Sequence, residues 1–147
     1  VYVNLTFDTV SYHGPYFHEW DPRGTIENVE NVNGSNYADT LIGNYKDNVL
    51  NGNAGNDTLT GMGGNDTFAF TKSAGGAVDF GHDTITDFTS GQDHVQTDHA
   101  IFANYADVQQ HMSQVGNDVV ITYDANNSIT LHDTTMANLH ASDFHFV

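Results

Sequence analysis

Cysteine is absent from the 147 residues, so no disulfide can stabilise this chain. Basic residues are scarce as well, since only Arg23, Lys46 and Lys72 stand against 19 acidic residues. No apolar run approaches the roughly 20 residues that a membrane-spanning helix requires, and the first residues do not have the pattern of a signal peptide. A domain that works outside the cell without disulfides needs another means of stabilisation, and a bound metal ion supplies one.

The lack of basic residues leaves a formal net charge of −16, which excludes several kinds of partner. A chain with this charge repels itself unless something neutralises it. Nucleic acids and anionic membrane surfaces would add to the repulsion. We therefore expect no nucleic-acid partner and no membrane span, and we expect a monomer.

Catalytic motifs are missing too. The chain has no G-x-S-x-G motif, no phosphate-binding loop and no thiol nucleophile. Ser11, His13 and Asp8 form a triad in composition only. We therefore predict that this chain is not an enzyme and that any activity belongs to an upstream part of a larger protein. Residues 1–5 alternate like the middle of a strand, and we expect the sequence to be a fragment without that upstream part.

What the sequence does contain is a repeat of nine residues between Gly34 and Ala69. Its four units are GSNYADTLI (34–42), GNYKDNVLN (43–51), GNAGNDTLT (52–60) and GMGGNDTFA (61–69). Position six of the unit is Asp39, Asn48, Asp57 or Asp66. Position eight is Leu41, Leu50, Leu59 or Phe68. A fixed short period indicates a solenoid.

The composition of each unit predicts a turn of six residues followed by a strand of three. Glycine and asparagine tolerate the positive φ of a sharp turn, and the middle side chain of so short a strand points to one side. Two units then close one coil, so the turn at 34–39 lies over 52–57 and the turn at 43–48 lies over 61–66. The gathered carboxylates and carbonyls repel one another unless a cation joins them. Ca²⁺, with roughly six to eight oxygen ligands, suits such a site better than Zn²⁺.

Outside the repeats the pattern predicts more strands and one helix. Residues 1–5 alternate as a strand, and 26–32 fits the nine-residue frame with Glu30 at position six and Val32 at position eight. Residues 83–88 and 93–97 indicate a strand pair around a turn at 89–92. Apolar spacings of three and four predict a helix from about Asn104 to Gln114 with Gly116 as its stop. A hairpin of 119–123 and 128–131 and a final strand around 144–147 complete the chain.

These motifs resemble those of RTX (repeats-in-toxin) proteins. The units at 34–69 are similar to the nonapeptide G-G-x-G-x-D-x-U-x, and D-T-I-T-D-F-x-x-G-x-D at 83–93 resembles the segment that follows the roll in serralysin-type C-terminal domains. Residues 116–131 and 139–147 resemble the C-terminal ends of type I secreted RTX proteins. The resemblance implies an all-β fold, a right-handed parallel β-roll with a C-terminal capping hairpin region and one short helix. It implies a single module (1–147) made of leading strands and loop (1–33), nonapeptide repeats (34–70), and a cap with the secretion region (71–147).

The resemblance implies calcium as the cofactor. It places the metal ligands at Gly34, Asn36, Asp39, Gly43, Tyr45, Asn48, Asn53, Gly55, Asp57, Met62, Gly64, Asp66 and Asp83. We rank the Asp39/Asp57 edge above the Asn48/Asp66 edge, because Asn48 lacks a charge and Lys46 adds a competing one, although Asp47 offsets part of this. Tyr37 stands where the pattern has glycine and is expected to strain the first turn. For Asp83 and Asp87 the alternative to a last calcium site is a place at strand ends facing water.

For two other groups of residues, the sequence permits either a binding site or an ordinary structural role. His13, His18, Glu19 and Asp21 have the spacing of a zinc or copper site, or they are ordinary exposed residues. Tyr16, Phe17 and Trp20 could stack on sugar rings, or their loop could pack over the first coil.

The resemblance also implies a function that depends on calcium concentration. In the cytosol the acidic repeats would stay unfolded and pass through a type I ABC exporter, and outside the cell millimolar calcium would fold them. We therefore expect a secreted, extracellular or cell-surface protein. The alternatives are a polysaccharide- or surface-binding module of an adhesin or of an enzyme resembling alginate epimerases, and a non-catalytic C-terminal part of a secreted protease or lipase.

Overall fold

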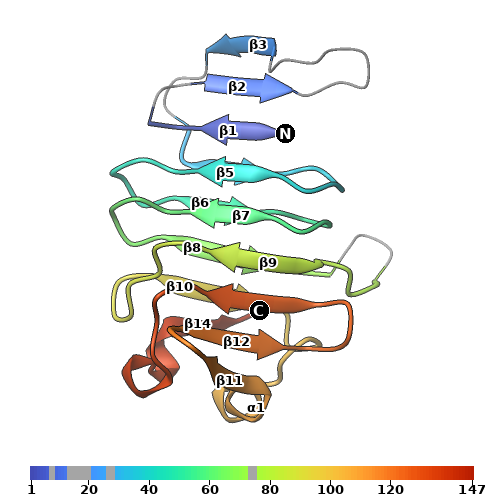
Figure 1. Ribbon diagram of the computed structural model, residues 1–147, viewed down its shortest axis with the longest axis vertical. Helices are drawn as coiled ribbons and strands as arrows, with labels where there is room; N and C mark the ends of the chain where they lie inside the picture. The colour runs from blue at the N-terminus through green and yellow to red at the C-terminus, as the bar shows by residue number, and fades with distance from the viewer. Residues whose placement is uncertain (7–8, 13–20, 26–28, 73–75) are drawn as a thin grey trace.

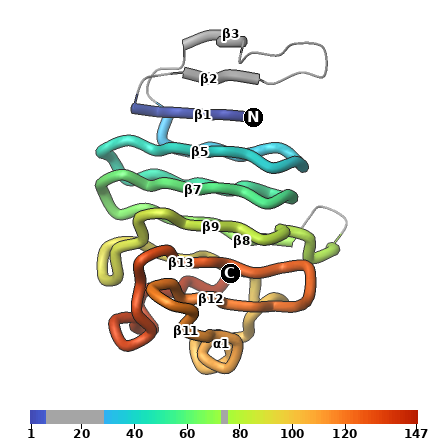
Figure 2. Tube along the Cα trace, viewed as in Figure 1, coloured from blue at the N-terminus to red at the C-terminus, as the bar shows by residue number. Residues whose placement is uncertain are grey.

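The computed structural model describes residues 1–6, 9–12, 21–25, 29–72 and 76–147. Short strands wind into two sheets that face each other, with the N-terminal strands at one end and a helix-bearing cap at the other (Figure 1). The chain passes from one sheet to the other after each strand of the repeats. The tube in Figure 2 shows β1, β5, β7, β9 and β13 following one another along the nine-stranded sheet.

The nine-stranded sheet has the order β11-β12-β13-β9-β7-β5-β1-β2-β3. Its strands in chain order are β1 (Tyr2–Asn4), β2 (Thr9–Tyr12), β3 (Asp21–Thr25), β5 (Thr40–Ile42), β7 (Thr58–Thr60), β9 (His82–Ile85), β11 (Met112–Val115), β12 (Asp118–Thr122) and β13 (Ser128–Leu131). The middle of this sheet, from β1 to β13, is parallel, and antiparallel strands extend it at both ends.

The five-stranded sheet has the order β14-β10-β8-β6-β4 and is parallel throughout. Its strands are β4 (Asn31–Asn33), β6 (Val49–Asn51), β8 (Thr67–Phe70), β10 (His94–Thr97) and β14 (Phe144–Phe146). The expected fit of Glu30 and Val32 to the nine-residue frame is confirmed, because Val32 pairs with Leu50.

The register confirms that two nonapeptides close one coil. Leu41 pairs with Leu59 on one sheet, and Leu50 pairs with Phe68 on the other. Each turn is therefore followed by the next turn on the opposite edge of the roll. The expected parallel β-roll is the fold of this chain.

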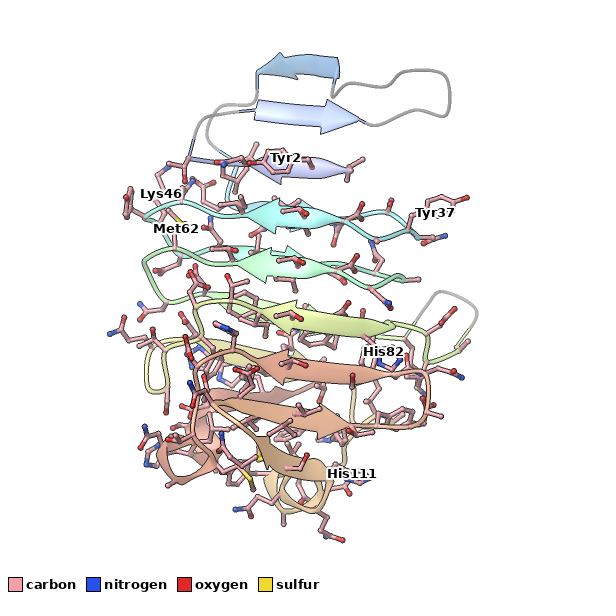
Figure 3. The ribbon with its side chains drawn as sticks, in the orientation of Figure 1. Tyr2, Tyr37, Lys46, Met62, His82 and His111 are labelled. Carbon is pink, nitrogen blue, oxygen red and sulfur yellow. The ribbon has the colours of Figure 1, made fainter. Side chains whose placement is uncertain are left out.

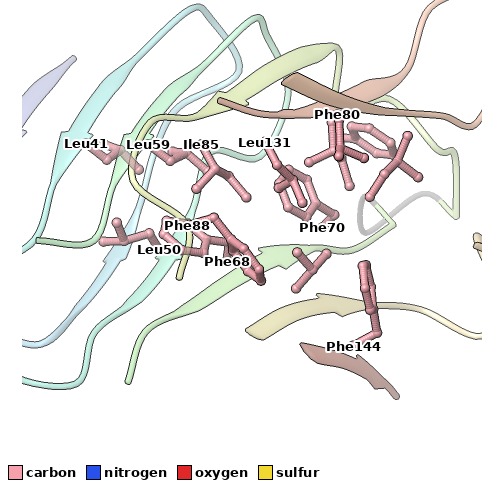
Figure 4. Packing of buried hydrophobic residues seen from close by; sticks show 14 of the residues in the cluster. Leu41, Leu50, Leu59, Phe68, Phe70, Phe80, Ile85, Phe88, Leu131 and Phe144 are labelled. Carbon is pink, nitrogen blue, oxygen red and sulfur yellow. The ribbon is translucent and has the colours of Figure 1, made fainter. Parts of the chain in front are cut away.

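The core lies between the two sheets and is built from the middle residue of each short strand. Leu41, Leu59 and Ile85 from one sheet face Leu50 and Phe68 from the other, and none of these five side chains is exposed (Figure 4). Larger rings fill the space toward the cap. The rings of Phe70 and Phe80 meet edge to face with 5.5 Å between their centroids. The core explains why position eight of every unit is a large apolar residue, since polar side chains would be buried there without partners.

The expected pairing of residues 83–88 with 93–97 is wrong. Strand β9 pairs with β7 and β13 in the nine-stranded sheet, whereas β10 pairs with β8 and β14 in the five-stranded sheet. The two segments therefore form one more coil of the roll. Ile85 joins the column of Leu59, and Val95 joins the column of Phe68, so each strand buries its apolar residue in the existing core.

The expected helix is present but shorter than predicted. Helix α1 spans Tyr105–His111, and Asn104 caps it by accepting a hydrogen bond from the Asp107 backbone N–H. The chain then continues as β11, which pairs antiparallel with β12 around a turn at Gly116. The Gly-Asn pair at 116–117 is a signal for a two-residue hairpin turn, and this signal outweighs the helical spacing of the residues before it.

The cap closes both edges of the roll with side-chain oxygens. The expected hairpin is confirmed as β12 and β13, and the last strand as β14, which follows two short 3₁₀ turns at Met136–Asn138 and Ala141–Asp143. Asn127 Oδ1 accepts hydrogen bonds from the backbone N–H groups of Phe80 and Gly81, at 2.8 and 3.1 Å. Asp143 accepts from Ser90 Oγ and from the Gly91 backbone N–H, at 2.7 and 3.0 Å. Within the described residues, no helix is long and apolar enough to cross a membrane.

Candidate metal centres at the stacked turns

The turns of the repeats form two stacks on opposite edges of the roll. We call the first the Asp57 stack (residues 34–39, 52–57 and 79–83) and the second the Asp66 stack (residues 43–48, 61–66 and 87–93). In Figure 3, Tyr37 and His82 of the first stack lie on one side of the molecule, and Lys46 and Met62 of the second lie on the other. Asp57 and Asp66 are therefore separated by the core, as the coil geometry predicts.

Within each stack, the carboxylates at position six form a ladder of hydrogen bonds with the turn before them. The Asp39 backbone N–H donates to Asp57 Oδ1 at 2.8 Å, and the Asp57 N–H donates to Asp83 Oδ1 at 2.7 Å. The Asp66 stack repeats the arrangement, because the Asn48 N–H donates to Asp66 Oδ1 at 2.9 Å.

Sequence reasoning missed the last step of the second ladder. The Asp66 N–H donates to Asp93 Oδ1 at 3.0 Å, so Asp93 holds the place that Asp83 holds in the first stack. A signal for it was present, since Asp93 stands two residues before the buried Val95 as each position-six residue stands before position eight.

Glycine at position one is required by this ladder. A Cβ atom added to Gly52 would lie 1.9 Å from Asp57 Oδ2, because the carboxylate folds back onto the start of its own turn. In the third and fourth units, glycine is also required at position four, but for a different reason. A Cβ atom on Gly55, where φ is 127°, would lie 2.6 Å from the carbonyl carbon of Tyr37 in the turn above.

The turns adopt two conformations that differ at position two. In the first two units the position-two N–H donates to the position-six side chain of the same turn: Ser35 donates to Asp39, and Asn44 donates to Asn48 at 2.8 Å. In the third unit Asn53 has a φ of 68°, and its N–H turns away to Asn51 Oδ1 at 2.9 Å.

Met62 in the fourth unit behaves like Asn53. Its φ is 77°, and its N–H donates to Asp87 Oδ2 at 2.8 Å. Asp87 also accepts from the Gly61 N–H at 2.9 Å, so its carboxylate caps the start of this turn. In the third and fourth turns, the Oδ2 atoms of Asp57 and Asp66 therefore accept no hydrogen bond from the backbone N–H of position two.

Among the described residues, two buried carboxylate oxygens are left without any hydrogen-bond partner. They are Asp57 Oδ2 and Asp83 Oδ2, which lie in successive turns of one stack. Asp57 is 2% exposed and Asp83 is 1% exposed, so water does not solvate these oxygens freely. Unpaired anionic oxygens at such depth are strongly unfavourable, and a cation between the turns would pair both. The residues present therefore fit a hard, oxygen-ligated metal ion.

The pKa values of these aspartates reflect the same conflict. Burial raises the pKa of Asp57 to about 6 and that of Asp83 to about 8, and each also feels the negative charge of a neighbouring aspartate in the stack. Burial likewise raises the pKa of Asp66 to about 6. The charges of Asp93, Asp87 and Asp47 act in the same direction on Asp66. The Asp66 stack therefore gathers more carboxylates than its Asn48 suggests.

The structure brings the predicted ligands together as two sets. Asp83 joins the first stack with Gly34, Asn36, Asp39, Asn53, Gly55 and Asp57, and the second stack holds Gly43, Tyr45, Asn48, Met62, Gly64 and Asp66. The side chains of Tyr37 and Tyr45 point outward, with 79% and 78% exposure, so Tyr45 could contribute only its backbone carbonyl to a metal. Whether each of these residues binds a metal ion stays a prediction.

Tyr37 and Lys46 behave differently in the structure from what the repeat pattern predicts. The strain expected at Tyr37 is wrong, because the non-glycine residues with positive φ in the described part of the chain are Asn53, Met62 and Asp133. Lys46 does not point into the Asp66 stack. Its ammonium lies 2.6 Å from Glu30 Oε1, which removes the competing charge from the turn.

The other candidate sites are not placed by the structure. His13, His18, Glu19, Tyr16, Phe17 and Trp20 lie outside the described residues, as do any side-chain contacts of Asp21. A zinc or copper site and a sugar-stacking surface there stay predictions. Among the described residues, Asp118, His132 and Asp133 lie near one another on the cap, and the latter two are exposed.

Comparison with known proteins agrees with the geometry of the turns. Residues 33–68 match the RTX calcium-binding nonapeptide repeat in four copies. None of the curated proteins matches the sequence significantly.

Among solved structures, the extracellular lipase LipA from Serratia marcescens is similar with a TM-score of 0.62 and 20% sequence identity over 84% of this chain. The alignment spans 20% of the lipase chain. The AlgE6R3 subunit of a mannuronan C5-epimerase from Azotobacter vinelandii gives a TM-score of 0.45 at 21% identity, over 78% of this chain and 76% of that one.

The lipase likeness shows a shared fold, and the repeat match supplies the chemistry of the stacked turns. The carboxylates of Asp57 and Asp66 are held in hydrogen-bonded ladders on two separate edges, so these two residues do not form a catalytic acid pair. Residues 33–68 are therefore RTX calcium-binding nonapeptide repeats, and they form the central coils of a parallel β-roll.

Proposed function

We propose that this chain is a calcium-dependent folding module of a larger secreted protein, with calcium ions bound between successive turns of each stack. The observation that supports the proposal best is the pair of buried, unpartnered oxygens Asp57 Oδ2 and Asp83 Oδ2. A divalent cation between these turns satisfies both oxygens and cancels the repulsion along the ladder.

The donor set favours calcium over smaller or softer metals. Carboxylates, amide oxygens and backbone carbonyls are all oxygen ligands, and successive turns of one stack supply them. Ca²⁺ accepts roughly six to eight oxygens in flexible geometry, whereas Mg²⁺ demands a near-ideal octahedron and Zn²⁺ prefers nitrogen and sulfur. In the third and fourth turns the backbone N–H of position two does not donate to the aspartate of the same turn. These two turns are therefore the better calcium sites, because the second oxygen of that aspartate can bind the ion.

Calcium binding and folding are coupled by mass action. An ion that binds the folded chain at a tenfold excess over its dissociation constant adds about 1.4 kcal/mol of stability. Because each inner aspartate belongs to two successive turns, neighbouring sites share ligands and fill cooperatively. The chain thus changes between disordered and folded over a narrow range of calcium concentration.

This coupling suits export through a type I ABC exporter. The chain would stay unfolded at the low calcium concentration of the cytosol and fold at the millimolar concentration outside, which exceeds the affinities of about 10⁻⁴–10⁻³ M usual for extracellular modules. The lipase that shares the fold is named as extracellular, which favours a secreted or cell-surface location for this chain. The matched part is 20% of that lipase chain. In line with the RTX resemblance, we propose that any enzymatic activity lies upstream in the parent protein.

The ranking of the two stacks can be tested by paired substitutions. Asp57→Ala should weaken calcium binding more than Asn48→Ala, because Asp57 contributes a charge and lies between two successive turns. Hydrogen bonds to charged groups are worth roughly 1.5–3 kcal/mol, so a ligand loss of similar size raises the dissociation constant about ten- to hundredfold. Calorimetric titration with calcium measures both variants.

Asp57→Asn is the matched control, since it keeps the shape and one oxygen while removing the charge. It should fall between the wild type and Asp57→Ala. Equal losses in Asp57→Ala and Asn48→Ala would contradict a special role for the unpaired Asp57 oxygen.

The cap should be needed both for stability and for export. Deleting residues 139–147 removes Phe144, which is buried against β10, and Asp143, which caps the last turn of the Asp66 stack. We expect the truncated chain to need more calcium to fold and to lose export through a type I system, because RTX-like proteins carry the export signal at the C-terminus.

Phe144→Ala separates the two roles of this segment. Loss of a buried phenylalanine costs about 3–5 kcal/mol, so this variant should need more calcium while keeping its export signal. Circular dichroism gives the calcium midpoint, and secretion yield gives the export. Normal export of the truncated chain would place the signal elsewhere.

A further inference from the structure

The repeats contain two Asn-Gly pairs whose surroundings differ. Asn33-Gly34 and Asn51-Gly52 both lie where a strand of the five-stranded sheet meets the next turn, and the two asparagines pair with each other in register. An asparagine followed by glycine can lose its side-chain amide, because the glycine nitrogen lacks a neighbouring side chain and can attack the asparagine Cγ. The reaction requires that this nitrogen be free to lose its proton.

Gly34 is not free in the folded chain. Its N–H donates to the Asn51 carbonyl at 2.7 Å, which continues the parallel ladder beyond β4. Attack on Asn33 Cγ would have to break this bond and twist the backbone out of the strand. Folding therefore protects Asn33, although its side chain is exposed.

Gly52 is placed differently. In the described part of the chain, its backbone N–H has no hydrogen-bond acceptor, whereas the amides of the other position-one glycines donate to Asn51, Thr60 and Asp87. The Asn53 N–H donates to Asn51 Oδ1 at 2.9 Å. This contact folds the Asn51 carboxamide back over the Gly52 peptide, and it withdraws electrons from Asn51 Cγ. A donor aimed at the oxygen also stabilises the charge that develops during the attack.

We propose that Asn51 is a site of spontaneous deamidation in the folded chain and that Asn33 is protected there. The Gly52 nitrogen loses its proton and bonds to Asn51 Cγ. The Cγ–Nδ2 bond then breaks, and Nδ2 takes up that proton and leaves as ammonia. Water then opens the five-membered imide to aspartate or isoaspartate. No oxidant or cofactor takes part. Because the contrast exists only in the folded chain, this inference rests on the proposed calcium-dependent folding.

Either product changes the repeat that it enters. Aspartate adds a negative charge next to the Asp57 turn, and isoaspartate lengthens the backbone by one atom between β6 and that turn. The ladder from the Asp39 N–H to Asp57 is built on an unbroken register. We expect isoaspartate at position 51 to raise the calcium concentration needed for folding, so the modification would limit the working life of the module.

The two sites can be compared within one sample. The 147-residue chain is incubated at neutral pH in calcium or in EDTA, and peptide mass spectrometry measures deamidation at each asparagine over time. In calcium we expect Asn51 to react about fivefold faster than Asn33, which corresponds to one typical hydrogen bond. In EDTA the two rates should be similar. Exposure alone predicts the opposite order in calcium, because Asn33 is exposed and Asn51 is half-buried.

Circular dichroism of the same samples separates the possible failures. If the chain folds in calcium and Asn33 reacts as fast as Asn51 or faster, the inference is overturned while the proposed function stands. If calcium produces no folding, the proposed function fails and the rates should not differ, which overturns the inference as well. Asn51→Gln, whose longer side chain cyclises slowly, should keep its calcium midpoint constant during incubation, whereas Asn33→Gln should lose affinity as the wild type does.

Discussion

In EDTA at neutral pH, the chain is expected to give the far-UV circular dichroism spectrum of a largely disordered polypeptide, and millimolar Ca²⁺ should convert it to β-structure. The reason is the set of buried aspartates. Burial raises the pKa of Asp57 and Asp66 to about 6 and that of Asp83 to about 8, so keeping these groups ionised in the folded chain at neutral pH costs several kcal/mol of stability. The whole stability of a domain is about 5–15 kcal/mol.

Magnesium is the control ion for this experiment. It carries the same charge but should restore much less structure, because it dehydrates reluctantly and demands octahedral geometry. Asp83→Asn is the control variant, since it removes one buried charge while keeping a side chain of similar shape. It should lessen the disorder in EDTA and weaken the response to calcium. A fully folded and thermally stable chain in EDTA would contradict the proposed coupling of folding to calcium.

Acid should replace calcium in part. In EDTA, lowering the pH from about 8 to about 4.5 is expected to increase β-structure, because the folded chain takes up protons at Asp57, Asp66 and Asp83 that the unfolded chain does not. The pKa values of these groups are higher in the folded state than the ordinary value of 3.8. Their contribution is therefore most favourable at low pH and is lost as the pH rises through about 6 and then about 8.

The same protons should act against calcium. Ligand carboxylates must be ionised to bind a metal, so the calcium affinity should begin to fall as the pH drops below about 8, where Asp83 takes up a proton, and should fall further below about 6. Circular dichroism at a series of pH values, with and without calcium, measures both slopes. Asp83→Asn should lose the part of the EDTA response that lies near pH 8. A structure content in EDTA that rises with pH would show that these carboxylates are not buried in the folded chain.

The fold of the repeats could be predicted closely from the sequence, because the nine-residue period sets the length of each half coil. A turn of glycine, asparagine and aspartate followed by one buried residue permits few other arrangements, and Leu41, Leu59, Leu50 and Phe68 pair as the period requires. Because each unit of nine residues makes half a coil, successive turns lie on opposite edges of the roll, and Asp57 is separated from Asp66. The end of α1 was harder to predict, since residues 112–115 have helical spacing but form a strand on β12.

The sequence by itself thus determined the nine-residue frame, the apolar column, and the acidic turns that the match to RTX repeats associates with calcium. The tertiary structure decided which oxygens are free to bind it. Ser35 and Asn44 donate to their own turns, while Asn53 and Met62 turn away, although all four hold position two. It also placed Asp93 and Asp83 as further steps of the ladders, outside the strict repeat. The physical reason is that hydrogen-bond partners and burial depend on the turns above and below, and no single nonapeptide contains its neighbours.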